Sequence, residues 1–194
     1  MGKDEDSEVY QLKITISGSN PTIWRRFLVD SDINLYKLHN IIQIVMGWTD
    51  SHLHHYRENN VFYGTPQPDP GWDFNSKFKT VDERKYKINQ ILTRPKMKIL
   101  YEYDFGDSWW HELVLEKIIG KDNKVKTPIC LDGAMACPPE DCGGIGGYYN
   151  MLEIIKNPDD SEYKDMIDWL GDEFDPEKID LEVINKKLKR IRNA

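Results

Sequence analysis

The sequence predicts an α+β fold in which an antiparallel sheet packs on helices and a helical part ends the chain. Apolar and polar residues alternate in several segments of the first half, which is typical of half-buried strands. In the last third, apolar residues recur every three or four positions, which is typical of amphipathic helices. Strands thus precede helices along the chain, as in α+β proteins. We expect a disordered tail at residues 1–8 and one domain over 9–194, sheet-rich over 9–126 and formed of loop and helices over 127–194.

The domain is predicted to open with a hairpin followed by a helix. Residues 9–16 alternate in polarity, residues 17–21 have the composition of a turn, and residues 23–29 form the returning strand. Asn34 can cap the next helix, and Gly47 can end it. This order resembles the opening of a β-grasp fold.

Further strands are expected in the middle of the chain. Residues 51–63 predict one or two short strands, and residues 98–105 and 110–119 predict two longer ones. Residues 65–80 and 127–147 are rich in proline and glycine, so we predict loops there.

The C-terminal part is predicted to hold three amphipathic helices. Their apolar positions run from Tyr148 to Ile155, from Tyr163 to Leu170 and from Leu181 to Ile191. The last helix ends in lysine and arginine, which the negative end of a helix dipole favours.

Charge and composition limit the possible partners. The 194 residues contain 33 acidic and 26 basic side chains, for a net charge of −7, and this balance disfavours wholesale binding of nucleic acid. The first residues are charged, the longest apolar runs are too short for a membrane span, and the chain has three cysteines. We therefore expect a cytoplasmic protein with reduced thiols and no membrane partner.

Histidines and cysteines are the candidate metal ligands. On a strand His52 and His54 would share a face and could hold a metal together, although no third ligand is evident. Cys130, Cys137 and Cys142 could form a zinc site with His111, but they lack the closely spaced pair of a zinc ribbon. Packing of these cysteines in a proline-rich loop is favoured over metal binding, and no cofactor is predicted.

The segment 142–147 allows two further interpretations. Cys142 precedes a run of glycines and a helix, whose amides could lower the pKa of the thiol or bind an anion. A closely packed turn explains the same glycines, and the neighbouring Glu140 and Asp141 would repel a phosphate. The closely packed turn is the favoured interpretation.

The turn from Asp104 to Asp107 and the residues after it form a second candidate site. Asp104, Asp107 and His111 could form an acid–histidine site, or a tight turn beside a structural histidine, which is favoured. Adjacent Trp109 and Trp110 must point to opposite faces of a strand, so one of them faces away from the core. We expect this turn and the cysteine-rich loop to meet between sheet and helices. The predicted acidic cleft is lined by Asp104, Asp107, Trp109, Trp110, His111, Glu140 and Asp141.

Taken in order, these motifs resemble the plasmid pRiA4b ORF-3-like family, which includes transposon passenger (TnpR-like) proteins. The strings that carry the resemblance are Trp24-Arg25-Arg26, Met46-Gly-Trp48, Ser51-His-Leu-His54, Tyr103-Asp-Phe-Gly-Asp107 with Trp110-His111, Cys130, Ala136-Cys-Pro-Pro-Glu-Asp-Cys-Gly-Gly144 with Gly147-Tyr148, and Trp169-Leu-Gly171 with Phe174-Asp-Pro176. The resemblance implies a link to plasmid and mobile-element biology, and it supplies no catalytic residues.

Three functions are compatible with the sequence. The first is a non-enzymatic binding or accessory protein whose partner is a protein or a small polar or cationic ligand. The second is a metal-dependent hydrolase or nuclease, for which His52, His54 or His111 must lie close to carboxylates. The third is nucleic-acid binding through Arg25 and Arg26 beside Trp24, which the acidic charge does not favour.

Overall fold

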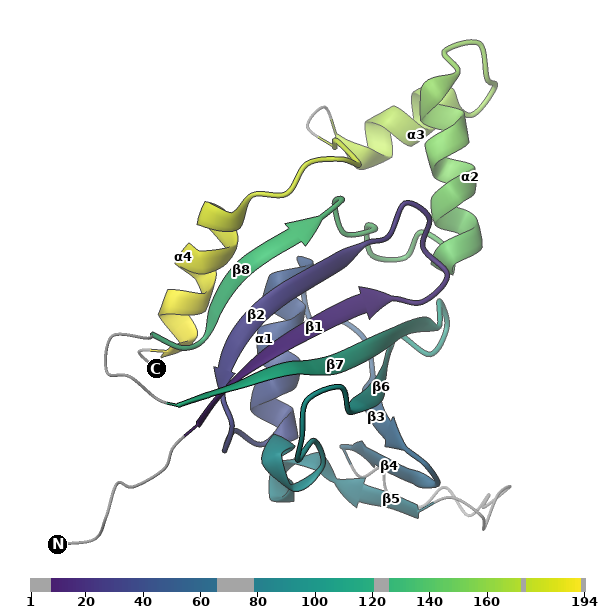
Figure 1. The fold of residues 1–194 in the computed structure, drawn as a ribbon. Helices are drawn as coiled ribbons and strands as arrows, with labels where there is room; N and C mark the ends of the chain where they lie inside the picture. Colours follow the sequence, from purple (N-terminus) through teal and green to yellow (C-terminus); the bar gives the residue numbers. More distant parts are fainter. Residues whose placement is uncertain (1–7, 66–78, 121–125, 172–173, 193–194) are drawn as a thin grey trace, which may run out of the picture.

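An eight-stranded sheet forms the body of the protein in this computed structural model, which describes residues 8–65, 79–120, 126–171 and 174–192 (Figure 1). The strand order is β5-β4-β3-β6-β7-β1-β2-β8. Neighbouring strands pair antiparallel except β4 and β5, which run parallel. The sheet and its helices confirm the predicted α+β class.

The predicted hairpin and helix are present as β1 (Glu8–Ile16), β2 (Trp24–Asp30) and α1 (Leu35–Met46). Strand β1 thus begins at Glu8, the last residue of the predicted tail. The Asn34 side chain accepts a hydrogen bond from the amide of Lys37 at 2.8 Å, and Gly47 ends the helix with a positive φ of 112°.

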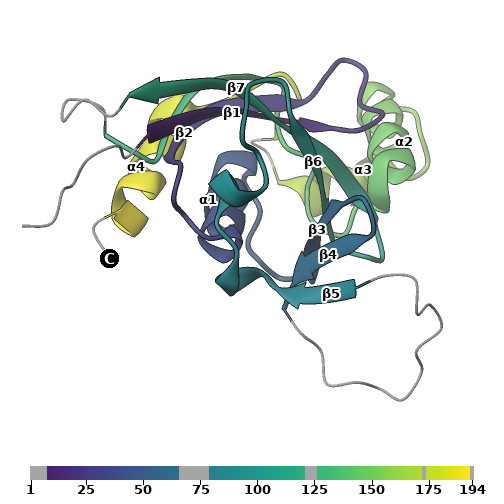
Figure 2. The same cartoon turned by 60° about the horizontal axis from the view of Figure 1, so that its bottom comes forward.

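The sheet curls around α1, so that the helix lies in its concave face (Figure 2). The curled half consists of β3 (His54–Glu58), β4 (Val61–Gly64), β5 (Lys79–Asp82), β6 (Lys98–Tyr103) and β7 (Trp109–Gly120). The predicted strands of this half are present, and two single-turn 3-10 helices, Glu83–Lys85 and Ile88–Gln90, follow β5. Of the predicted loop over 65–80, residues 66–78 lie outside the described part of the chain.

The prediction of a continuous loop over residues 127–147 is wrong, because β8 (Ile129–Ala134) lies within it. Strand β8 pairs with β2 at the edge of the sheet and packs against the last helix. Its sequence contains Asp132 and Gly133, which weaken a strand pattern. This segment joins the sheet because it pairs with β2 and packs against the last helix. Neither contact can be predicted from the local sequence pattern.

The C-terminal part is helical, as predicted, with α2 (Gly144–Lys156), α3 (Tyr163–Leu170) and α4 (Leu181–Arg192). In α2, Ile154 is buried where the predicted pattern had Ile155. In α4, Leu188 is fully buried, whereas Ile191 at the end of the predicted face is exposed. Among the described residues, no helix has the length and apolar character needed to cross a lipid bilayer.

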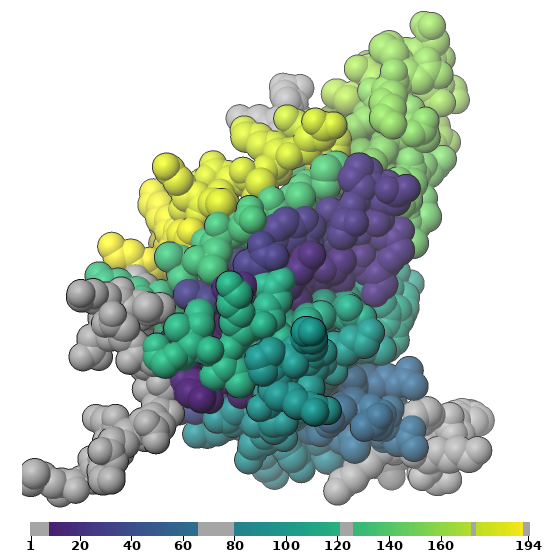
Figure 3. Space-filling model, in the orientation of Figure 1, coloured from purple at the N-terminus to yellow at the C-terminus, as the bar shows by residue number. Residues whose placement is uncertain are grey.

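The two faces of the sheet have different environments. Aromatic side chains of β3, β6 and β7 point inward to α1 and form much of the core, whereas the face of β1, β2 and β7 seen in Figure 3 has no helix in front of it. The polar residues discussed below lie where the concave face meets the C-terminal end of α1 and the start of β3.

Candidate functional site

A pocket of about 660 Å³ opens beside α1 and the start of β3. Its walls include the exposed apolar side chains of Tyr36, Leu53 and Phe105, and four histidines also border it. Each of these histidines has a ring nitrogen within 3.2 Å of a carboxylate oxygen. The four pairs are His39–Asp50, His52–Asp141, His54–Glu83 and His55–Glu102.

Two of these imidazoles lie against each other at the pocket floor. The rings of His39 on α1 and His54 on β3 are stacked, with centroids 3.4 Å apart and an interplanar angle of 3°. Nε2 of His39 lies 2.7 Å from a carboxylate oxygen of Asp50, and Nε2 of His54 lies 2.9 Å from one of Glu83. The Glu83 side chain is fully buried, so His54 is fixed by a carboxylate inside the protein, whereas the Asp50 side chain beside His39 is half exposed.

The electrostatics of the floor keep His39 neutral. Burial and, to a lesser extent, the neighbouring His54 lower the pKa of His39 to about 4, although Asp50 partly opposes this shift. A neutral imidazole keeps a lone pair at neutral pH, which is the form that binds a metal ion.

A hydrogen-bond chain orients the ring of His39. Gln43 donates to the hydroxyl oxygen of Tyr101 at 3.2 Å, and this oxygen lies 2.7 Å from Nδ1 of His39. Because Gln43 donates, the Tyr101 hydroxyl can donate its hydrogen to Nδ1, which places the imidazole proton on Nε2 beside Asp50. The buried polar face of α1 therefore serves to position one imidazole.

His39, Asp50 and His54 together have the composition of a metal site. Each offers one ligand atom, and these atoms lie within 4.8 Å of one another. Ligand atoms on a tetrahedral zinc ion lie roughly 3.4 Å apart. Metal binding would therefore require Nε2 of His39 and the Asp50 oxygen, 2.7 Å apart here, to separate, and the two parallel rings to tilt toward a shared ion. The Asp50 side chain, at 52% exposure, has the freedom to move. Two imidazoles and one carboxylate are a common set for a first-row divalent metal with positions left open.

A second group surrounds His52, in the segment between α1 and β3. Ligand atoms of His52, Asp104 and Asp141 also lie within 4.8 Å of one another. Nδ1 of His52 lies 3.7 Å from Asp104, and Nε2 lies 3.7 Å from Glu140 and 3.2 Å from Asp141. These carboxylates come from the β6–β7 turn and from the loop after β8, which sequence analysis predicted to meet.

Comparison with known proteins places this chain in a family. Residues 8–183 match the family described as plasmid pRiA4b ORF-3-like protein. The chain belongs to this family.

Two relatives extend the family assignment. The plasmid pRiA4b ORF-3-like chain is 31% identical over 187 residues to a protein of Sinorhizobium fredii (strain NBRC 101917 / NGR234) described as uncharacterized protein y4hQ, with 94% of this chain and 91% of that protein covered. It is similar to the crystal structure of a protein of unknown function, MM3350 from Methanosarcina mazei Go1 (TM-score 0.79, 40% identity, 91% of this chain and 97% of that chain covered). These descriptions give the family and the fold, and they name no activity.

Some of the residues predicted to line an acidic cleft lie together in this plasmid pRiA4b ORF-3-like protein. Asp104, Glu140 and Asp141 converge on His52, and Asp107 accepts a hydrogen bond from the amide of Gly143. The structure contradicts two further positions, because Trp109 and His111 are 1% and 0% exposed and lie in the core.

The core positions follow from strand alternation. In β7, Trp109 and His111 face inward, whereas Trp110 points to the other face and lies half-buried, with its ring 5.7 Å from that of His55. The prediction that one of the two tryptophans faces away from the core is confirmed for Trp110. His111 contacts the ring of Trp48 and is a structural histidine.

The prediction that His52 and His54 hold one metal together does not match the geometry. Strand β3 begins at His54, so His52 lies in the preceding segment and is not held on the same strand face. Each histidine belongs to a different group of ligands.

The cysteines are free thiols, of which Cys130 is buried and Cys137 and Cys142 are half-buried. Burial raises the pKa of Cys130 to about 11, and burial together with Asp107 and Asp141 raises that of Cys142 to about 12. Burial also raises the pKa of Cys137 well above its usual range. Within the described part of the chain, neither histidine–carboxylate group includes a cysteine. The favoured packing role fits this chemistry, whereas an activated Cys142 thiol does not.

The glycines that begin α2 are required by close packing. A Cβ atom on Gly147 would lie 1.9 Å from the carbonyl oxygen of Cys142, and one on Gly144 would lie 2.4 Å from that of Asp107. The Asp107 side chain binds the amide at this helix start, so a carboxylate occupies the place where a bound phosphate would need donors.

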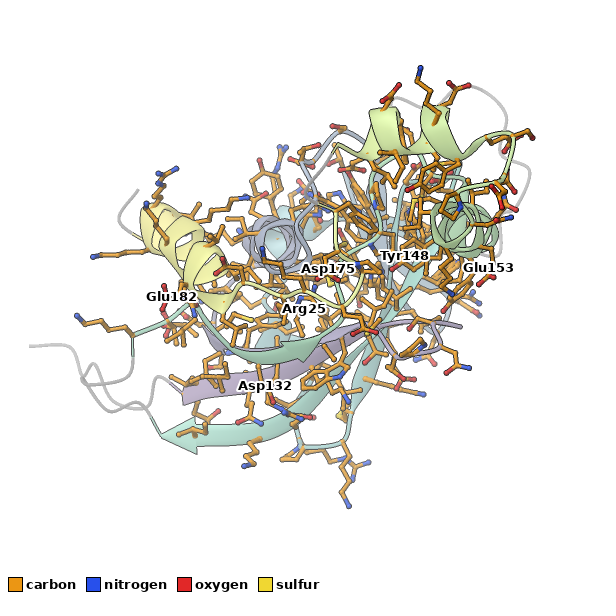
Figure 4. The ribbon with its side chains drawn as sticks, turned by 90° about the horizontal axis from the view of Figure 1, so that it is seen from above. Arg25, Asp132, Tyr148, Glu153, Asp175 and Glu182 are labelled. Atoms are coloured by element: carbon orange, nitrogen blue, oxygen red, sulfur yellow. The ribbon has the colours of Figure 1, made fainter. Side chains whose placement is uncertain are left out.

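The predicted nucleic-acid contact through Arg25 and Arg26 is wrong for Arg25. Arg25 is 2% exposed, lies between the sheet and the helices (Figure 4), and donates to the backbone carbonyls of Trp24, Val45 and Ala134. Arg26 is on the open face, where its guanidinium binds both carboxylate oxygens of Glu116. Arg25 is therefore a buried structural cation near the C-terminal end of α1.

Sequence reasoning missed His39, Asp50 and Glu83. His39 lies one turn after Leu35 on the apolar face of α1. A histidine among apolar residues on that face could have been selected from the sequence as a candidate site residue. Asp50 adopts a positive φ of 59°, which the sequence does not reveal. Glu83 approaches His54 only because β5 pairs with β4.

Proposed function

We propose that this protein binds a divalent transition-metal ion with His39, Asp50 and His54, and that the metal-loaded pocket binds a small ligand. The observation that carries this proposal is the pair of stacked imidazoles at the pocket floor, with Asp50 beside Nε2 of His39 and the buried Glu83 bonded to Nε2 of His54. Histidine ligands that are oriented by carboxylates are typical of metal sites. In this proposal the metal ion binds to the protein, and the organic ligand then binds to the metal-loaded pocket.

The number of ligands supports a ligand-binding site over a purely structural one. Structural zinc ions are enclosed by four protein ligands, whereas sites that act on a ligand keep a position open. Here three protein ligands border an open pocket. The open positions are available to an oxygen or nitrogen atom of the bound molecule.

The pocket walls support a ligand with an apolar body. Tyr36, Leu53, Phe62 and Phe105 line the pocket, and its volume of about 660 Å³ is in the range of small-molecule sites. We expect a molecule whose metal-binding polar group reaches the floor while its apolar part contacts these walls.

The test is a calorimetric titration of tag-free, chelator-treated protein with Zn²⁺ and then with Mn²⁺. The matched variants are Asp50→Asn, which keeps a residue tolerant of positive φ, and Asp132→Asn on the far edge strand, whose side chain is similarly exposed at 57%. We expect Asp50→Asn to lower the affinity of one site at least tenfold and Asp132→Asn to bind as the wild type. Identical isotherms for all three proteins would refute the proposal.

Metal-dependent hydrolysis is the second candidate function. The buried Glu83 lies 2.9 Å from His54, and such an outer carboxylate raises the basicity of a metal-binding imidazole. A metal ion with open positions can lower the pKa of a bound water. Turnover of activated carboxylic and phosphate esters by the wild type, lost in Asp50→Asn, would support hydrolysis. Equal rates in both proteins would exclude this site as the source.

We also propose, from family resemblance, that the protein serves an accessory role in plasmid or mobile-element biology. The description of the matching family refers to a plasmid. A deletion strain with unchanged plasmid maintenance and transposition frequency would argue against this role.

A further inference from the structure

We propose that a second divalent cation binds between His52, Asp104 and Asp141 and holds the loop 135–143 against the sheet. This site is separate from the stacked imidazoles and does not depend on the function proposed above. It uses none of the three residues that form the first group.

Two carboxylates of this group each place an oxygen beside the His52 ring. Asp104 uses Oδ1 to accept the amide of Gly106 at 2.9 Å, and its Oδ2 lies 3.7 Å from Nδ1 of His52. Glu140 uses Oε1 to accept the amide of Thr49 at 2.9 Å, and its Oε2 lies 3.7 Å from Nε2 of His52 and accepts a hydrogen bond from the Tyr103 hydroxyl at 3.3 Å. The backbone thus fixes one oxygen of each side chain and leaves the other beside the imidazole, with Asp104 at one ring nitrogen and Glu140 at the other.

The excess of negative charge around His52 favours binding of a cation. Among the described residues, His52 is the one basic side chain within 4.0 Å of Asp104, Glu140 or Asp141. Nε2 of His52 is shielded from solvent and makes no hydrogen bond of acceptable geometry within the described part of the chain, although Asp141 lies 3.2 Å away. A metal ion would satisfy this nitrogen and offset the repulsion among three carboxylates.

The ligand set indicates the type of ion. Calcium takes oxygen ligands alone, whereas one imidazole with two or three carboxylates suits Mn²⁺, Fe²⁺ or Zn²⁺. Asp141 is 73% exposed and can approach the ion by rotating its side chain. We therefore expect a first-row divalent ion at this second site.

The position of the site explains what the ion would do. His52 precedes β3, Asp104 follows β6, and Asp141 lies in the loop between β8 and α2. A shared ion would join three segments that are far apart in the sequence. Since His52 and Leu53 also line the pocket, the ion would fix one of its walls.

The test is equilibrium dialysis of full-length protein against Mn²⁺, with the bound metal measured by elemental analysis. The wild type should bind two equivalents, and Asp50→Asn, Asp141→Asn and the Asp104→Asn/Asp141→Asn pair should each bind one. Asparagine is the matched change, because Asp50, Asp104 and Asp141 all have positive φ. Asp107→Asn is the control, because Asp107 holds the same loop through Gly143 but is not one of the three ligands.

Hydrogen exchange of residues 135–143 gives a second readout. Mn²⁺ should slow exchange there about tenfold in the wild type and in Asp107→Asn, but not in Asp141→Asn, whose exposed side chain can change without unfolding the protein. If Asp50→Asn loses one equivalent while the Asp104→Asn/Asp141→Asn pair keeps two, the second site is refuted and the first stands. If the Asp104→Asn/Asp141→Asn pair loses one equivalent while Asp50→Asn keeps two, the second site stands and the function proposed above fails.

Discussion

At the scale of single residues, the hydroxyl of Tyr101 determines how His39 presents its nitrogens. Burial raises the pKa of Tyr101 well above its ordinary value, so the side chain remains a neutral phenol. Metal binding at Nε2 of His39 would reverse the tautomer described above: the imidazole proton would move from Nε2 to Nδ1, and the Tyr101 oxygen would become its acceptor. Tyr101 is therefore a positioning residue for the proposed metal site.

Replacing Tyr101 with phenylalanine should lower zinc affinity about 10- to 100-fold, because the orienting partner of His39 is removed. The matched control is Tyr56→Phe, since the buried Tyr56 hydroxyl donates to the carbonyl of Leu35 and does not contact His39. Both variants should lose about 1 kcal/mol of unfolding free energy. Equal zinc affinities in the two variants would show that Tyr101 does not position the ligand.

His111 makes stability depend on pH. Burial lowers its pKa from 6.5 to about 4, so between these values the unfolded chain takes up a proton that the folded chain does not. The free energy of unfolding therefore falls as the pH falls through this window. The stabilising contribution of the neutral His111 is fully present above about pH 6.5. The contribution of this one residue is roughly 3 kcal/mol.

The variant His111→Leu should show a flatter dependence of unfolding free energy on pH between 7 and 4, measured by urea denaturation with a chelator present. Part of the dependence should remain, because burial also lowers the pKa of His39 and of His55 to about 4. An unchanged slope in the variant would mean that His111 accepts a proton in the folded protein.

Single residues were the least predictable level. His52 and His54 could be selected from the sequence because they occur close together, yet their carboxylate partners come from β5, the β6–β7 turn and the loop after β8. Trp109 and His111 were predicted in an open cleft because their neighbours in sequence are acidic. Strand alternation fixes only that they share a face, and it does not tell which face is covered.

At the scale of elements, the start of α2 depends on glycines that allow close contact. Gly147→Ala should cost about 1–3 kcal/mol of stability, because the added methyl group would overlap the carbonyl of Cys142. Gly146→Ala, at an exposed position of the same helix with no atom within 4 Å of the added Cβ, should be neutral or stabilise by up to about 1 kcal/mol. Thermal unfolding of both variants measures the difference, and equal melting temperatures would show that the loop moves freely away from the helix.

Elements with a strong local pattern were predictable, and those held by distant partners were not. The hairpin, α1 and the three C-terminal helices follow from periodicity and capping residues. Strand β8 was missed because its place depends on β2 and α4. The first candidate metal group has residues on α1, on β3 and in the segment between them, whereas all three residues of the second group lie in connecting segments.

At the scale of the whole molecule, the curl of the sheet around α1 creates the pocket. It brings β3 beside the helix, so that His54 stacks on His39, and it brings the end of β6 close to the loop after β8 (Figure 2). The α+β class and the family could be predicted from the sequence. The curl could not, because it depends on the packing of aromatic side chains between sheet and helix.

Anomalous X-ray diffraction at the zinc edge, from crystals grown with one or two equivalents of Zn²⁺, tests the proposed metal site directly. We expect an anomalous peak within bonding distance, about 2.0–2.2 Å, of ligand atoms from His39, Asp50 and His54. Crystals of Asp50→Asn should lose this peak or show it much weakened. A zinc-loaded wild-type crystal with no peak beside the stacked imidazoles, while His39 and His54 keep their positions, would contradict the central claim.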